Sequence, residues 1–436
     1  GKLTTMTYNS RGQITSMTDP LMRVTNFTYQ ENSALAGYKQ QKSVQSVIPA
    51  NSSSVTFDST DRIASSTGSD GYTASYFYDN LDRLTRTTYP DATYETYQYT
   101  HLDLVRSKDR ENRVTERGYD GARRLRWERD PLGQLTQYDW CSCGSLKELI
   151  DPKGNATKWE YSPSGRNTKK IYSDGRTYLM AYDTAGRLTS STDPKNQATV
   201  FTYALDDSVL TKTYQGAVIP TSGVSYSYDP AYPRLTNWTD NIGITNYSYI
   251  PNNGSSNGAG NRASIDGPWA NDTQTYSYDT IGRTTGYTLP NGGEAMTYDN
   301  LDRPQTATTV LGTSTFAYDG ATARLLSDTH TSGLNMTMAY QPAAANFRLK
   351  QLKFSHTSTG LISQNDYLHS PAGRITAWER SFGDGSPALV HSYQYDSVDH
   401  LTGVTTKNKL TQAILTDTAF QYDLAGNRVG EKTGTA

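Results

Sequence analysis

The sequence is poor in the residues that build a conventional hydrophobic core. Only 35% of its 436 residues are apolar, with nine Phe and seven Met, and the mean hydropathy is −0.70. No window holds the roughly eighteen consecutive apolar residues of a membrane-spanning helix. Charged residues make up 19% of the chain, below the roughly 25% of an average protein, which also excludes a highly charged disordered segment.

The sequence also has few cysteines, a small net charge and no signal-peptide pattern. Two cysteines are too few for a disulfide framework. A net charge of −2 gives no long-range attraction to nucleic acid or to anionic lipid, so we expect neither as a partner. The chain opens at Gly1 without a signal peptide and directly in strand-like sequence. This favours a piece of a longer polypeptide, and it leaves the location open.

Tyrosine is abundant instead. The chain has 33 Tyr against nine Phe, and it is rich in Thr, Ser, Gly and Asn. Tyr and Thr favour strand positions, and Tyr tolerates one end of its side chain in water. The composition therefore predicts a β-rich chain with a thin, partly hydrated core.

The tyrosines belong to an internal repeat, in which an aromatic anchor is followed by Asp, then by Gly or Asp, then by Arg and an aliphatic residue. We expect the Asp to cap turn amides and to pair with the neighbouring Arg, and the Gly to supply a positive φ. The positions expected to hold the repeats together are Tyr78, Asp79, Arg83, Tyr119, Asp120, Tyr182, Asp183, Gly186, Arg187, Tyr278, Asp279, Gly282, Arg283, Tyr422, Asp423 and Gly426.

The anchors recur at a nearly constant interval. With Tyr138 as one of them, they fall at 57, 78, 99, 119, 138, 161, 182 and 203, so the differences are 21, 21, 20, 19, 23, 21 and 21. Later copies, including one anchored at Tyr367, are spaced more widely, with loop insertions near 250–276 and 341–394. We expect a single array over 1–436, with about 20 repeats of about 20–21 residues.

Turn signals also lie between the anchors, such as Asp-Pro-Leu-Gly at 130–133 and Asp-Pro-Lys-Asn at 193–196. Each repeat thus has two turns and two strands, and short connections make antiparallel neighbours. Pairs such as Tyr76 and Tyr78 share one face of a strand, so we expect tyrosines to stack from repeat to repeat. The predicted fold is all-β: tandem antiparallel β-hairpins that form a curled ribbon.

The Tyr-Asp-X-X-Gly-Arg-Leu period with its Asp-Pro-X-Gly turns resembles the Rhs/YD-repeat family, from Tyr8 to Arg428. That family includes bacterial Rhs polymorphic toxins, the C components of Tc toxins, wall-associated proteins and animal teneurins. The resemblance implies a spiral β-shell, which in bacterial members often encloses a C-terminal toxin domain. The family's self-cleaving element with its aspartates is not visible, so we carry over no catalytic residue.

Individual chemical candidates are weak. Cys141 and Cys143 lie two residues apart and offer two sulfurs to one metal, but zinc needs two further ligands and the six His are scattered. A local turn variant without metal is the favoured interpretation, and a free cysteine pair argues against a disulfide-dependent fold. The aspartates recur in every copy, whereas a catalytic dyad is singular. We expect no enzyme, no metal and no cofactor.

Two functions remain. The first is a structural scaffold: a segment of a secreted or cell-surface Rhs-type shell, with a bacterial source favoured, that encapsulates or presents a toxin or other cargo domain of the same polypeptide. The alternative is an extended adhesion or binding module whose tyrosine face contacts glycans or other surface proteins.

Overall fold

The computed structural model describes residues 3–29, 41–46 and 52–434. In that part of the chain, 38 β-strands and one 3-10 helix of three residues form, so the all-β prediction is confirmed. Among these residues no helix is long and apolar enough to cross a membrane. Strands that follow one another along the chain pair antiparallel within the units, as in β7 with β8 and β8 with β9.

The chain divides into two compact units. Unit 1 comprises Gly1–Arg117, Arg129–Gly133 and Ala295–Ala436, and unit 2 comprises Gly118–Glu128 and Gln134–Glu294. A strand that crosses a boundary is counted below with the unit that holds most of its residues. The expectation of one array over 1–436 stays a prediction.

Besides the short stretch Arg129–Gly133, unit 1 contains two long segments, an N-terminal segment up to Arg117 and a C-terminal segment from Ala295. The elements of the N-terminal segment are β1 (Thr5–Tyr8), β2 (Ile14–Thr18), β3 (Val24–Tyr29), β4 (Gln41–Ser46), β5 (Ser52–Phe57), β6 (Ile63–Thr67), β7 (Thr73–Tyr78), β8 (Leu84–Thr88), β9 (Tyr94–Thr100), β10 (Asp103–Lys108) and β11 (Val114–Tyr119). Those of the C-terminal segment are β27 (Gly292–Tyr298), β28 (Pro304–Thr309), β29 (Gly312–Tyr318), β30 (Leu325–His330), β31 (Leu334–Tyr340), η1 (Ala343–Ala345), β32 (Leu349–His356), β33 (Gly360–His369), β34 (Ile375–Phe382), β35 (Leu389–Tyr395), β36 (Leu401–Asn408), β37 (Ile414–Tyr422) and β38 (Arg428–Gly434).

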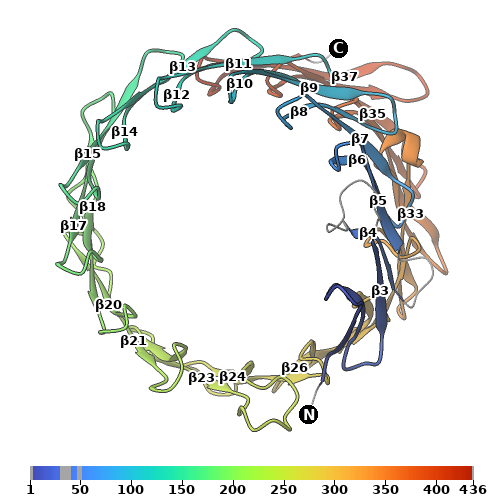
Figure 1. The fold of residues 1–436 in the computed structure, drawn as a ribbon. Helices are drawn as coiled ribbons and strands as arrows, with labels where there is room; N and C mark the ends of the chain where they lie inside the picture. The colour runs from blue at the N-terminus through green and yellow to red at the C-terminus, as the bar shows by residue number, and fades with distance from the viewer. Residues whose placement is uncertain (1–2, 30–40, 47–51, 435–436) are drawn as a thin grey trace. The chain divides into compact units, whose positions relative to one another are not determined.

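Unit 2 is a further run of hairpins, whose strands follow one another along a curved path (Figure 1). Its strands are β12 (Leu125–Arg129), β13 (Leu135–Trp140), β14 (Leu146–Ile150), β15 (Ala156–Tyr161), β16 (Asn167–Ile171), β17 (Thr177–Tyr182), β18 (Leu188–Thr192), β19 (Ala198–Tyr203), β20 (Val209–Gln215), β21 (Val224–Tyr228), β22 (Leu235–Thr239), β23 (Ile244–Tyr249), β24 (Arg262–Asp266), β25 (Gln274–Tyr278) and β26 (Thr284–Leu289).

A layered core is missing from the described part of the chain. Apart from three glycines, its buried residues are Ala74, Thr87, Thr245 and Asn365, and no large side chain there is fully buried. The predicted thin core is therefore confirmed. The hairpins are held by their main-chain ladders and by polar cross-strand pairs, such as the hydroxyls of Thr202 and Thr211, 2.6 Å apart. Hydrophobic burial, the usual main driving force, is spread thinly along the ribbon.

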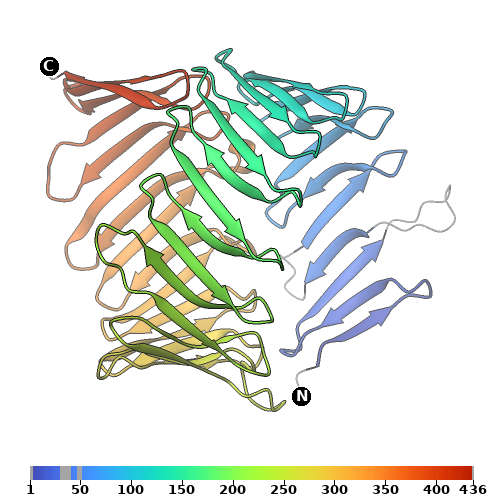
Figure 2. The same cartoon turned by 90° about the vertical axis from the view of Figure 1, so that its left-hand side faces the viewer.

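In unit 1 the two segments lie beside each other (Figures 1 and 2), although they are far apart in the sequence. Turns of the N-terminal segment contact turns of the C-terminal segment through residues 254 to 286 positions apart. This contact zone is called the seam. It is formed by turns 19–23, 68–72, 89–93 and 109–113 on one side and by turns 299–303, 319–324, 341–348, 370–374 and 396–400 on the other.

Candidate functional site: the repeat turns and the seam

In many copies the turn after the anchor is built around one aspartate. In the copy that begins at Tyr78, the Asp79 Oδ1 atom accepts the N–H groups of Leu81 at 2.9 Å and Arg83 at 3.1 Å. The Oδ2 atom accepts the Arg83 Nε–H at 2.7 Å. Asp82 closes the turn with a φ of 60°. The anchor itself occupies a β-bulge opposite Leu84, which re-aims the strand end into the turn.

The other predicted repeat positions repeat this geometry. Asp120, Asp183 and Asp279 each accept the backbone N–H and the guanidinium Nε–H of their own Arg124, Arg187 or Arg283. Gly186, Gly282 and Gly426 have φ of 90°, 87° and 80°, as predicted. At Asp423 the partner is Asn427 instead of an arginine. The predicted Asp–Arg pairing is thus present within the turns.

Neighbouring repeats also contact each other through these arginine and tyrosine side chains. The Arg187 guanidinium lies 5.0 Å from the ring centre of Tyr203, and its Nη1 donates to the Ala204 carbonyl at 2.7 Å. The Tyr203 hydroxyl donates back to the Leu188 carbonyl at 2.7 Å. Tyr182, Tyr278 and Tyr422 make the same hydroxyl contact with the preceding repeat, and Arg83 lies over Tyr99. Charge–ring and hydroxyl–carbonyl contacts therefore connect the repeats.

The expected stack of tyrosines is wrong. Among the described residues the close ring pairs are Tyr72–Phe347, Tyr172–Tyr178, Trp378–His391 and His400–Tyr422, and none joins two anchor tyrosines. In several copies an arginine lies over the next anchor, as Arg83 over Tyr99 and Arg187 over Tyr203, and His400 stacks on Tyr422. A guanidinium is attracted to the negative face of an aromatic ring. A guanidinium between two tyrosine rings is therefore favoured over two rings that face each other directly.

Two anchors were misassigned from the sequence. The bulges fall at Trp140 and His369, not at Tyr138 and Tyr367. The Trp140 Nε1–H donates to the Leu125 carbonyl at 2.7 Å, as an anchor hydroxyl does elsewhere. With 140 in place of 138, the two irregular spacings of 19 and 23 become 21 and 21. Tyr138 and Tyr367 were preferred because tyrosine identity was given more weight than the period.

The cysteine prediction also needs correction. Cys141 and Cys143 form a disulfide, so neither is a free thiol or a metal ligand. The turn brings their Cα atoms to 5.1 Å, within the range that a disulfide requires. Cys141 stands where other copies have Asp, which upholds the turn-variant interpretation. No group of three or more His, Cys, Asp or Glu that would hold a metal occurs in the described ranges.

The seam is held mainly by ion pairs. Arg23 reaches Asp302 at 2.7 Å, and Arg324 reaches Asp70 at 2.6 Å. Arg113 pairs with Asp399. These arginines use one side of the guanidinium for the aspartate of their own turn and the other for the opposite segment, as in Arg113 with Asp109. The sequence predicted only the pairing of a repeat arginine with the aspartate of its own turn, and the partner across the seam was not predicted.

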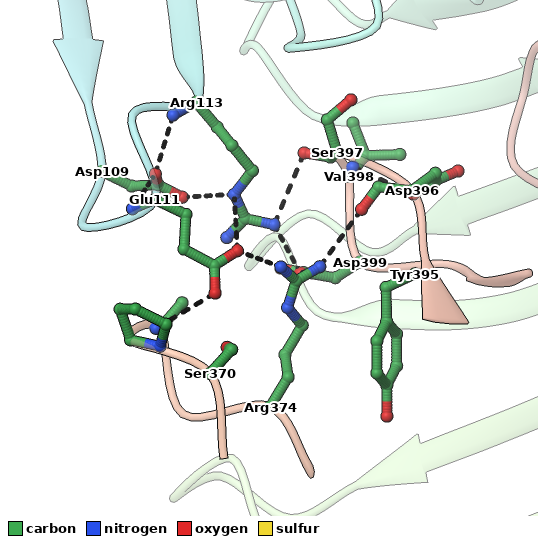
Figure 3. Close-up of polar contacts among 12 residues, drawn as sticks. Asp109, Glu111, Arg113, Ser370, Arg374, Tyr395, Asp396, Ser397, Val398 and Asp399 are labelled. Carbon is green, nitrogen blue, oxygen red and sulfur yellow. Dashed lines mark hydrogen bonds and ion pairs between the residues drawn. The ribbon is translucent and has the colours of Figure 1, made fainter. Parts of the chain in front are cut away.

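At the turn 370–374 the carboxylate comes from the opposite segment (Figure 3). Ser370 stands where other copies have Asp. The Glu111 Oε1 atom accepts the Ala372 N–H at 3.2 Å, and its Oε2 atom pairs with the Arg374 guanidinium. These are the two kinds of donor that the turn aspartate binds elsewhere. Glu111 therefore replaces the missing turn carboxylate across the seam, and its side chain is only 13% exposed.

A polar contact without an ion pair lies next to it. The turn 341–348 carries η1, and Asn346 at its end has a φ of 61°. Asn346 Nδ2 donates to Asp91 at 2.6 Å, and its Oδ1 accepts the Tyr72 hydroxyl at 2.8 Å. The predicted insertion after 341 thus extends a turn far enough to reach the opposite segment.

The seam perturbs the titration of its charged groups. Burial raises the pKa of the Asp70 carboxyl, but the Arg324 guanidinium and the Tyr72 N–H outweigh it and lower this pKa below its usual range. Asp302 is the largest cause of the raised pKa of Arg23. Both shifts favour the charged forms that pair. Clefts of about 390 Å³ at Arg113 and about 530 Å³ at Arg324 open beside these pairs.

Comparisons with known proteins agree with this geometry. The RHS Repeat family model matches residues 57–94, which include the turns of Asp58 and Asp79. A search of curated protein sequences found no match. The crystal structure of TcdB2-TccC3-Cdc42 is similar over 100% of this chain and 26% of its own, with a TM-score of 0.74 and 13% identity.

A second similar structure is the Photorhabdus luminescens Tc holotoxin pore, with a TM-score of 0.73, 12% identity and coverage of 100% of this chain and 25% of its own. The crystal structure of TcdB2-TccC3 gives 0.74, 13%, 100% and 26%. The chain spans about a quarter of the length of these structures, and at such identity the likeness concerns the fold.

The hairpin array, its thin core and its interlocked turns define a β-hairpin repeat protein. The RHS Repeat family model matches one stretch of the chain, residues 57–94, and the fold of the whole chain is that of the TcdB2-TccC3 structures.

Proposed function

We propose that the chain is a segment of a shell wall that encloses or presents a cargo domain of the same polypeptide, in a secreted or surface-associated protein. The seam carries this proposal. Hairpins alone extend a ribbon in one direction. Ion pairs between turns 254 to 286 residues apart join two ribbon segments through their turns. A wall needs this second direction of contact.

The chemistry of the strands fits a wall as well. Both faces of a sheet without a layered core remain available, so one face is free to meet a cargo while the other meets solvent. One of the similar structures is a Tc holotoxin pore, and this supports cargo enclosure by analogy of fold. We propose no catalytic residue, metal or cofactor in this segment.

The test uses the full-length polypeptide in which the chain occurs, digested with a small amount of protease. We expect segments outside the repeats to be cleaved more slowly than the same segments expressed alone, because the wall shields them. Glu111→Gln combined with Arg374→Met is expected to speed this cleavage, whereas Arg166→Met, in a turn of unit 2, serves as the matched control. Rapid loss of every non-repeat segment while the wild-type repeats stay intact would refute enclosure.

Glycan binding by the aromatic residues stays a prediction. A glycan array probed with the chain tests it, and saturable binding to one class of sugar would favour the adhesion alternative over the wall.

A further inference from the structure

The disulfide turn between β13 and β14 places sulfur in a position built for negative charge. The Cys141 Sγ atom accepts the N–H groups of Cys143 at 3.1 Å and Ser145 at 3.3 Å. These amides lie two and four residues after Cys141. In the Asp79 turn the carboxylate oxygen accepts the amides at the same two offsets, from Leu81 and Arg83.

The amides of such a turn stabilise an anion. Together with the Arg83 guanidinium, which is the largest cause, they lower the pKa of the Asp79 carboxyl below its usual range. The cysteine turn has Ser145 in place of the arginine, and Arg124, which is paired with Asp120, donates its Nη1–H to the Cys141 carbonyl at 3.0 Å, so the two amides are the donors that face the sulfur. Positive charge and amide donors stabilise a thiolate for the same reason that they stabilise a carboxylate.

The two sulfurs differ in access. Cys143 is exposed, and so are Ser142 and Gly144 on either side of it, whereas Cys141 is half-buried. A small molecule in solution therefore reaches the Cys143 sulfur first. The better-stabilised sulfur is the less accessible one, so the attacked atom and the leaving atom are clearly distinguished.

We propose that the Cys141–Cys143 turn is a thiol–disulfide exchange site whose substrates are small monothiols, of which glutathione is the probe, and their disulfides. In the first step a thiolate attacks Cys143 Sγ, a mixed disulfide forms there, and the electron pair of the broken S–S bond goes to Cys141 Sγ. In the second step another thiolate attacks the small-thiol sulfur and releases Cys143 as a thiolate. Two monothiols are thereby oxidised to their disulfide, and the protein disulfide is reduced to two thiols. The reverse sequence oxidises the turn.

The fold survives this exchange because the released Cys141 thiolate stays at the position of the turn aspartate. It keeps the two amide contacts, and the backbone bond from Cys141 N–H to the Ser145 carbonyl at 2.9 Å closes the turn independently of the sulfur. Exchange is thus expected without loss of β-structure.

The test is a timed reaction of the whole folded chain with reduced glutathione, stopped by an alkylating agent. Trypsin then releases both cysteines in one peptide, residues 130–147. We expect the isomer with glutathione on Cys143 and the alkyl group on Cys141 to exceed the reverse isomer about tenfold, because the better-stabilised thiolate leaves faster. Circular dichroism of the reduced chain should match that of the oxidised chain.

The controls separate this chemistry from ordinary thiol reactivity. A synthetic 130–147 peptide disulfide lacks the turn and should give the two isomers in similar amounts. Cys143→Ser leaves the Cys141 thiol, which we expect to be alkylated with its half-maximal rate at a lower pH than the Cys143 thiol of Cys141→Ser, with the difference lost in urea. Equal isomers from the folded chain, glutathione mainly on Cys141, or no reaction while the peptide reacts completely would each overturn the proposal.

Discussion

The contact between Glu111 and Arg374 gives the sharpest test of the seam. Their side chains are only 13% and 21% exposed, and Glu111 also accepts the Ala372 N–H. A charge-assisted hydrogen bond contributes about 1.5–3 kcal/mol, while exposed pairs contribute roughly 0.2–1 kcal/mol. For a pair that is mostly but not fully buried, we expect a coupling free energy of about 2 kcal/mol.

A double-mutant cycle measures this coupling without counting the costs of each change alone. Glu111→Gln keeps the shape and the acceptor for Ala372 but removes the charge, and Arg374→Met keeps much of the packing. The readout is hydrogen exchange at turns 109–113 and 370–374, because opening of a seam is local and a global melt averages it away. A coupling of about 2 kcal/mol corresponds to roughly a 30-fold change in the opening equilibrium.

The matched control is Arg166→Met. Arg166 closes a turn of unit 2 that also has Ser, Ser162, where other copies have Asp, and its Nη1 bonds Ser164 Oγ at 2.9 Å. Its loss should change local exchange by less than about 0.5 kcal/mol, as for an ordinary surface substitution. A Glu111–Arg374 coupling within about 0.3 kcal/mol of zero, the usual error of additivity, would refute an electrostatically held seam.

Two further predictions concern the repeat itself. Burial raises the pKa of the Asp58 carboxyl, but the Arg62 amide and guanidinium lower it to about 2. A carboxyl with a lowered native pKa stabilises the fold at pH values above its unfolded pKa of about 4, and this stability is lost as the pH falls toward 2. Denaturant unfolding at pH 7 and pH 3 should show this loss, and Asp58→Asn should reduce it; equal stability at both pH values contradicts it. Tyr203→Phe removes the hydroxyl bond to Leu188 but keeps the ring, so we expect about 0.5–1.5 kcal/mol less stability by denaturant unfolding. Tyr178→Phe, at an exposed ring, is the control, and equal losses would show that the hydroxyl bond is not what matters.

The repeat was predictable because its physics is local. A turn of five residues contains its own acceptor, donors and positive φ, so Asp79, Gly186 and Arg187 reveal their roles from order and spacing alone. Anchors at Trp140 and His369 were missed because residue type was preferred to period, although the 21-residue interval pointed to 140. The disulfide was missed because the number of cysteines tests only for a framework of several disulfides. It does not test whether two cysteines in one turn form a local bridge.

The seam was not predictable in the same way. Nothing near Glu111 in the sequence indicates Arg374, because 263 residues separate them and their meeting depends on the summed twist of many strands. One local signal did exist. The turn 370–374 keeps Gly373 and Arg374 but has Ser370 in place of the aspartate, so a guanidinium and an amide lack their usual acceptor. A missing acceptor in a strict repeat predicts that a partner supplies it, without saying which.

That reasoning makes a prediction about Ser370→Asp. Arg374 Nε and Ser370 Oγ have no hydrogen-bond partner among the described residues, so an introduced carboxylate would bind Arg374 Nε and the Ala372 N–H, as Asp79 binds its own turn. It would then compete with Glu111 at close range, and two carboxylates at one site repel each other. We expect slower hydrogen exchange within the turn 370–374, together with a Glu111–Arg374 coupling less than half its wild-type value.

Glu111→Gln in this background should cost nothing or should stabilise the seam, because it removes the repulsion. Binding of both carboxylates by Arg374 is chemically reasonable as well, because Arg113 pairs with Asp109 and Asp399 at once through two sides of its guanidinium. Arg374 differs because Glu111 also occupies the amide of Ala372, where the turn aspartate would bind. A coupling that keeps its wild-type value in the Ser370→Asp chain would therefore show that both carboxylates fit, and that Glu111 is an added partner instead of a replacement.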